Sequence, residues 1–125
     1  MNFTSIDAVA AHFPGFQRGV PDQNPSDAQI EVWIENEGSR VRGFAEDRGY
    51  VLAGLIMSNP RAHCLLSLAN EIGAAAELGD ALFSLRGPDA WPPDWANPNS
   101  LRRSYGNMLR ELGRGSYDKL FLVPA

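Results

Sequence analysis

Apolar residues recur at helical spacing in four stretches of the chain, and helix start signals precede them. The first stretch covers residues 4–13, where the Thr4 hydroxyl is suited to cap the helix N-terminus. The second covers 26–48 and begins with a capping box at 26–29, while Gly49 is suited to end it. These patterns predict two amphipathic helices in the first half of the chain.

Two more helices are predicted in the second half. Asn59 and Pro60 provide a cap and a first helical position for a helix over 60–85. Its apolar face has small residues at the centre, so another helix can approach closely there. A fourth helix is predicted over 98–112, with apolar residues on one side and arginines on the other. The small residues of the third helix are Ala69, Gly73, Ala76 and Gly79.

Together these helices predict an all-α fold, a small bundle of about four helices that forms one domain over residues 1–116. A chain of 125 residues can bury enough surface to support its own core. The expected core residues are Trp33, Ile34, Val41, Phe44, Leu65, Ile72, Leu109 and Leu112.

Two segments lie outside the predicted helices. Residues 87–99 hold four prolines and two tryptophans, Trp91 and Trp95, so an irregular segment is expected. The indoles either pin this segment onto the bundle or serve as exposed anchors for a partner. Residues 117–125 are predicted to form an extended tail, with strand character from Leu120 to Val123. That tail either adds to another chain as a strand or folds back near the two tryptophans.

Charge is unevenly distributed along the chain. The formal net charge is −4, with −7 in residues 1–100 and +3 in residues 101–125. A basic end on an acidic body suits docking onto an acidic partner or onto copies of the chain. A solvated, arginine-rich helix face explains the same pattern. The candidate partner-binding residues are Arg102, Arg103, Arg110, Arg114, Tyr117, Leu120, Phe121, Leu122 and Val123, together with Trp91 and Trp95.

No residue pattern indicates an enzyme. His63 and Cys64 are adjacent, so on a helix their side chains point about 100° apart and do not face each other. His12 is the only other histidine, which leaves a zinc site short of its usual four ligands. We therefore expect no catalytic, metal or cofactor site. A single cysteine permits no internal disulfide, and no apolar run approaches the length of about 18 residues that spans a bilayer.

Several motifs resemble a known family. They comprise the start at 4–7, the Phe-Pro-Gly stop at 13–15, the capped Ser-Asp-Ala-Gln-Ile-Glu-x-Trp-Ile-Glu stretch, the Ala/Gly-rich stretch at 68–76, and Leu-Arg-Arg-Ser-Tyr-x-x-Met-Leu-Arg-Glu-Leu at 101–112. In this order they resemble the head-to-tail adaptor (connector) proteins of tailed double-stranded DNA bacteriophages. The Trp/Pro-rich segment 87–99 departs from the family's common pattern.

The resemblance implies a structural virion protein, made in the host cytoplasm and placed in the neck between capsid and tail. Its helical subunits would form a homo-oligomeric ring, commonly of twelve, docked on the portal protein and followed by tail, stopper or terminator proteins. Genomic DNA would pass through the ring without specific binding, which suits an acidic body.

Two other function classes remain open. The basic segment 101–119 is consistent with a small helical regulator that binds DNA. Retardation of a labelled duplex at moderate salt would separate this hypothesis from the adaptor hypothesis. A small enzyme without a recognisable motif is the third hypothesis.

Overall fold

The computed structural model describes residues 2–86 and 98–122, and these residues form helices without a strand. The helices are α1 (Ile6–Ala10), α2 (Asp27–Asp47), α3 (Leu55–Ser58), α4 (Pro60–Arg86), α5 (Pro98–Arg114) and α6 (Asp118–Phe121). The all-α class is confirmed. The four predicted helices correspond to α1, α2, α4 and α5, while α3 and α6 are additional short helices that the apolar pattern did not predict.

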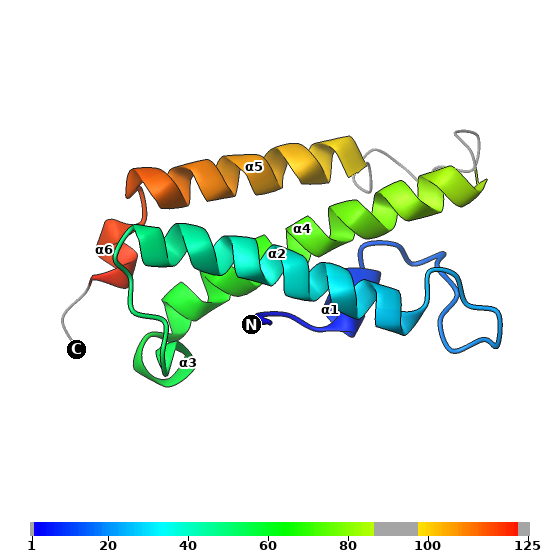
Figure 1. The fold of residues 1–125 in the computed structure, drawn as a ribbon, viewed down its shortest axis with the longest axis horizontal. Helices are drawn as coiled ribbons and strands as arrows, with labels where there is room; N and C mark the ends of the chain where they lie inside the picture. The colour runs from blue at the N-terminus through cyan, green and yellow to red at the C-terminus, as the bar shows by residue number, and fades with distance from the viewer. Residues whose placement is uncertain (1, 87–97, 123–125) are drawn as a thin grey trace.

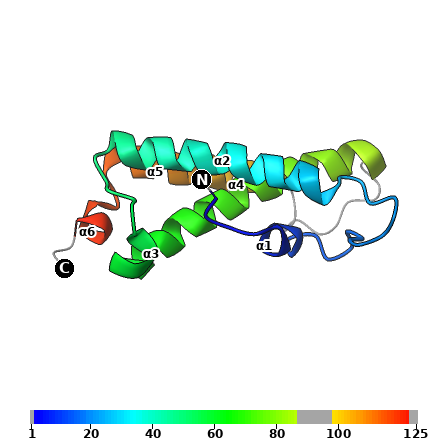
Figure 2. The same ribbon diagram turned by 60° about the horizontal axis from the view of Figure 1, so that its bottom comes forward.

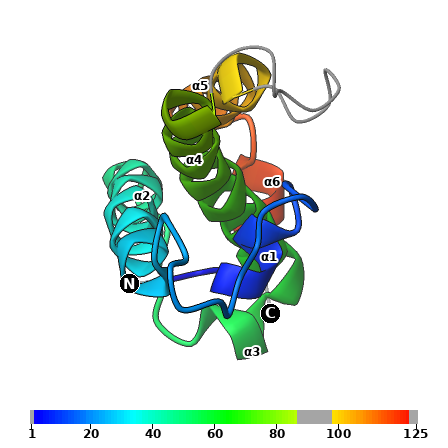
Figure 3. The ribbon, with the colours of Figure 1, turned by 90° about the vertical axis from the view of Figure 1, so that its right-hand side faces the viewer.

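Helix α4 is the centre of the fold. It contacts each of the other five described helices, and α2 and α5 run along it as the other long elements (Figures 1 and 3). Helix α1 packs against α4 and α2, whereas α3 and α6 lie at the end of the molecule where α4 begins (Figure 2). This central position explains why α4 carries buried residues around most of its circumference. None of the helices in the described ranges combines the length and apolarity needed to cross a membrane.

The helix ends follow local chemistry closely. The Ser26 hydroxyl accepts a hydrogen bond from the Gln29 amide at 3.2 Å, and Asn59 Oδ1 accepts one from the Ala62 amide at 3.2 Å, as the cap signals predicted. The first cap was misplaced by one residue, because Ser5 rather than Thr4 caps α1. Gly49 follows α2 with a φ of 95°, a conformation that suits glycine at a helix end.

The end of α5 differs from the expected position. Gly113 lies inside the helix, which continues to Arg114, and Gly115 ends it with a φ of 83°. A Cβ at Gly113 would come within 3.3 Å of the Phe44 ring, so α5 passes close to α2 at this point. The last turn of α5 is therefore supported by a neighbouring helix.

The core is arranged differently from the expected set of residues. Ile34, Val41, Leu109 and Leu112 are buried as predicted, but Phe44 is 40% exposed. Trp33, Leu65 and Ile72 are only partly buried. Because α4 is enclosed by several helices, its buried set extends beyond one stripe. The fully buried aliphatic side chains include Val9, Ile30, Leu66 and Leu78, which the expected set did not contain.

The predicted close approach along α4 is confirmed at Gly73. A Cβ there would lie 2.8 Å from two ring carbons of Tyr105 in α5. The Tyr105 hydroxyl donates to the Glu37 carbonyl oxygen in α2 at 3.3 Å. Burial raises the Tyr105 pKa strongly, and the nearby Glu37 side chain adds to this shift. One tyrosine thus joins the three long helices.

Asn70 is the fully buried polar side chain of the core. Its Oδ1 accepts a hydrogen bond from the Phe3 amide at 2.9 Å, and its Nδ2 donates to the Ile34 carbonyl oxygen at 3.0 Å. These bonds attach the N-terminal segment and α2 to the middle of α4.

Candidate docking site

The C-terminal segment folds back onto the bundle, so the expected extended tail is wrong over residues 117–122. Asp118–Phe121 forms α6, and Tyr117, Leu120 and Phe121 pack against the buried core. The Phe121 ring stacks on Tyr50 with centroids 4.1 Å apart and planes 1° from parallel. The apolar run looked strand-like in isolation, but no strand among the described residues is available to pair with it, and Leu120 and Phe121 instead pack partly buried against the core in a helical turn. Val123 lies outside the described residues.

Polar contacts hold α6 in this position. Arg48 donates from Nε to Asp118 Oδ1 at 3.1 Å and from Nη2 to Oδ2 at 2.6 Å, and the Tyr50 hydroxyl also donates to Asp118. Asn59 Nδ2 donates to the Leu120 carbonyl oxygen at 2.8 Å. Asn59 therefore caps α4 with its oxygen and holds α6 with its nitrogen.

These contacts shift the pKa values of Asp118 and Tyr50, and the hydrogen bonds to Asp118 also raise the pKa of Arg48. The hydrogen bonds from Arg48 and then Tyr50 lower the pKa of Asp118 to about 2. Burial raises the pKa of Tyr50 to about 12, and its hydrogen bond to Asp118 adds to this effect. Both shifts favour the paired arrangement near neutral pH.

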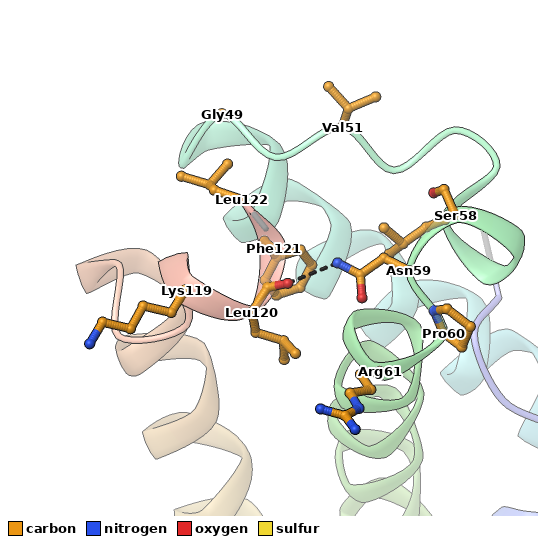
Figure 4. A pocket seen from close by; sticks show the side chains of 11 residues that line it. Gly49, Val51, Ser58, Asn59, Pro60, Arg61, Lys119, Leu120, Phe121 and Leu122 are labelled. Atoms are coloured by element: carbon orange, nitrogen blue, oxygen red, sulfur yellow. Dashed lines mark hydrogen bonds between the residues drawn. The ribbon is translucent and has the colours of Figure 1, made fainter. Parts of the chain in front are cut away.

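A groove of about 860 Å³ opens between α6, the α2–α3 connection and the start of α4 (Figure 4). We call it the α3–α6 groove. Its walls are mostly apolar, and none of its lining residues is an acid. The lining residues are Gly49, Val51, Leu55, Ser58, Asn59, Pro60, Arg61, Lys119, Leu120, Phe121 and Leu122.

Large apolar side chains beside the groove are open to solvent. Val51 is 77% exposed and Met57 is 86% exposed, and Ile56 and Leu122 also have more than half of their surface in water. Figure 4 shows Val51 and Leu122 projecting at the rim of the groove. Several exposed large apolar side chains next to a hollow are typical of a surface that binds another macromolecule.

Two cations complete the lining of the groove. Arg61 comes from the first turn of α4 and Lys119 from α6, and the Lys119 side chain extends outward, away from the other lining residues (Figure 4). Neither forms an ion pair with another described residue, although the chain as a whole is acidic. The groove is therefore suited to an apolar segment that carries negative charge.

The predicted partner-binding arginines lie elsewhere. Arg103, Arg110 and Arg114 are exposed on the side of α5 opposite its buried residues, as the helical spacing requires. Arg102 forms an ion pair with Asp80 of α4 instead. None of these arginines lines the α3–α6 groove.

Of the remaining predicted residues, the groove includes Leu120, Phe121 and Leu122, while Trp91 and Trp95 lie outside the described residues. The sequence interpretation missed Val51 and Arg61. The signal for Val51 was the apolar run at 50–57, which belongs to no long helix and is more exposed than a core segment. Nothing in the sequence indicated a binding role for Arg61, because a single cation at a helix start is common.

The residues considered for chemistry have structural neighbours. His12 Nε2 lies 2.8 Å from Glu71 Oε2, and His63 meets the Phe3 ring edge-on at 6.1 Å. Cys64 is exposed. Within residues 2–86 and 98–122, no cluster of three or more His, Cys, Asp or Glu side chains is placed to hold a metal ion.

The chain was compared with family models, curated proteins and solved structures. No family model, curated protein or solved structure matches it.

Proposed function

We propose that this protein is a structural assembly subunit that docks through the α3–α6 groove. The single observation that carries the proposal is the groove itself, an apolar hollow rimmed by the exposed Val51 and Leu122. Leaving such surface in water is unfavourable by about 25 cal/mol per Å², so covering it with a partner stabilises the assembly.

Within this class, we propose the role of a head-to-tail adaptor of a tailed bacteriophage, in a ring docked on a portal protein. The motifs at 4–7, 26–35 and 101–112 support it by their resemblance to that family. The acidic body adds support, because a ring subunit with net negative charge repels the DNA that passes through it.

The test compares matched substitutions in solution. Light scattering gives the mass of the purified chain alone and after mixing with a candidate portal protein. Val51→Asp places a charge on the groove rim, and we expect it to abolish the increase in mass. Val32→Asp serves as the control, because Val32 is also an exposed valine but lies on α2. The proposal fails if the chain alone stays a monomer and mixing does not increase the mass of the portal protein, or if both variants assemble normally.

DNA binding through α5 is the second candidate, and one observation favours it. Arg103, Arg110 and Arg114 form an exposed stripe along a single face of the helix. Such a stripe is suited to bind phosphates, and replacing any one of these arginines should reduce the salt dependence of binding. Retardation of a duplex by the native chain, abolished in Arg103→Glu/Arg110→Glu and retained in Val51→Asp, would favour this function over the adaptor.

A further inference from the structure

We infer that the α3–α6 groove binds residues 87–97 of a second copy of this chain, so that subunits join head to tail. This inference rests on the proposed function only in placing the contact in the same groove. It names the occupant, which the proposed function leaves open.

The first argument is chemical complementarity. The groove offers apolar walls with two cations, Arg61 and Lys119, and no acid in its lining. Residues 87–97 hold two tryptophans and two acids, Asp89 and Asp94, with no basic residue. Large aromatic side chains are the usual anchors of protein interfaces, and opposite charges fix their register.

The second argument concerns backbone polarity. Pro92 and Pro93 lie between the two tryptophans. Proline has no N–H group, so this stretch brings fewer donors that an apolar groove would leave unpaired. The segment is therefore better suited to a groove with few polar partners than an ordinary loop sequence.

The third argument is reach, and it decides between the same chain and a second copy. The groove includes Pro60 and Arg61 at the start of α4, whereas residues 87–97 are attached to Arg86 and Pro98 at the opposite end of the molecule (Figure 1). At 1.5 Å per residue, α4 separates the two ends by about 40 Å. Eleven residues anchored at both ends extend only about 20 Å from their anchors. The segment therefore cannot enter its own groove.

Residues 123–125, at the C-terminal end, are a weaker candidate for the segment that occupies the groove. Residues 123–125 follow Leu122 at the rim, but they are Val, Pro and Ala and contribute no acidic side chain to meet Arg61 and Lys119. Residues 87–97 of another copy provide tryptophans for the apolar walls and aspartates for the two cations. Because the attachment points of the donor segment, Arg86 and Pro98, are distant from the groove, the contact is heterologous and repeats into a ring or a filament.

The test uses complementation between two full-length variants. Trp91→Ser/Trp95→Ser removes the anchors but keeps the groove, and Val51→Asp/Leu122→Asp disables the groove but keeps the segment. We expect the native chain to form oligomers, and each variant alone to remain a monomer of 13.7 kDa. An equimolar mixture should give a heterodimer of twice that mass and nothing larger, because one intact groove receives one intact segment.

Light scattering at several concentrations measures these masses, and circular dichroism checks that each variant is folded. If a variant does not fold, reversing the charges on the segment and on the groove tests the same contact. Asp89→Lys/Asp94→Lys should weaken association about tenfold or more, and adding Arg61→Glu/Lys119→Glu to the same chain should restore it.

Three results would overturn the inference. They are a native chain that stays monomeric, a mixture of the two variants that gives no heterodimer, and loss of assembly on removing residues 123–125 alone. A monomer that still bound a portal protein would overturn the inference but leave the proposed function intact. Failure of both self-association and portal binding would instead remove the proposed function.

Discussion

Arg48 and Asp118 form a two-point ion pair that attaches α6 to the end of α2. The hydrogen bonds measure 3.1 Å from Nε to Oδ1 and 2.6 Å from Nη2 to Oδ2. The two residues are 70 positions apart in the chain, so the contact exists only in the folded state. It fixes one wall of the α3–α6 groove.

We predict that this ion pair makes stability depend on acid pH. The pKa of Asp118 is about 2 in the folded chain, against an ordinary value of 3.8. Above 3.8 the carboxylate is ionised in both states, and its contribution to stability is fully present. As the pH falls from 3.8 towards 2, the unfolded chain gains the proton first, so the contribution is lost.

Urea unfolding of the native chain and Asp118→Asn between pH 6 and pH 2 measures this effect. The gap between their midpoints should shrink as the pH falls through this window. Asp47→Asn is the control, since Asp47 is an exposed acid at the end of α2 without an ion pair to another described residue. A gap that stays constant with pH would contradict the prediction.

The Tyr50 hydroxyl predicts the opposite dependence at alkaline pH. Its pKa is about 12 in the folded chain and near 10 when unfolded. As the pH rises from 10 towards 12, the unfolded tyrosine loses its proton first, which favours unfolding. The native chain should therefore lose stability relative to Tyr50→Phe over this range. Unfolding midpoints at pH 8 and pH 11 check it, and equal losses in both chains would count against it.

Two substitutions at Asn59 should distinguish its role in capping α4 from its role in holding α6. Asn59→Asp keeps an acceptor for the Ala62 amide but removes the donor to the Leu120 carbonyl oxygen. We expect α4 to remain intact while amide exchange over 118–122 becomes faster, with a loss of about 1 kcal/mol. Asn59→Ala removes both bonds and should cost about 1 kcal/mol more. Identical exchange profiles for the two variants would show that the roles are not separable.

Gly73 is expected to tolerate no side chain. The strain of about 1–3 kcal/mol from placing a methyl group against the Tyr105 ring outweighs alanine's helix advantage of up to about 1 kcal/mol. We expect Gly73→Ala to lower the free energy of unfolding by roughly 1 kcal/mol. Gly106→Ala is the matched control, because a Cβ there has no neighbour within 4 Å and should stabilise the helix. Thermal unfolding of both variants decides, and stabilisation by Gly73→Ala would disprove the tight seam.

Asn70 should be the polar residue on which the N-terminal segment depends. Asn70→Ala leaves the buried Phe3 amide without its acceptor, which costs about 1–3 kcal/mol. Asn36→Ala, an exposed asparagine on α2, should change stability little. Denaturant unfolding together with amide exchange at Phe3 tests this. Unchanged protection at Phe3 in the Asn70 variant would contradict it.

Local signals in the sequence determined the long helices and their starts. Ser26 and Asn59 act within three residues of their partners, so their capping roles can be predicted without knowledge of the fold. Glycine at position 73 likewise indicated a close helix contact, because small residues in a helix face have few other uses. The identity of the partner, Tyr105, could not be predicted from the sequence.

The tertiary structure decided the rest, because it depends on contacts between residues far apart in the chain. Phe44 has the spacing of a core residue, yet it stays 40% exposed where α5 crosses α2 near Gly113. The run at 120–123 was predicted to be a strand, but Tyr50 stacks on Phe121 and Asn59 binds the Leu120 carbonyl oxygen, so its first residues form part of α6. The groove between α3 and α6 arises from the same packing. Its walls come from two segments, 49–61 and 119–122, which no periodicity along the chain brings together.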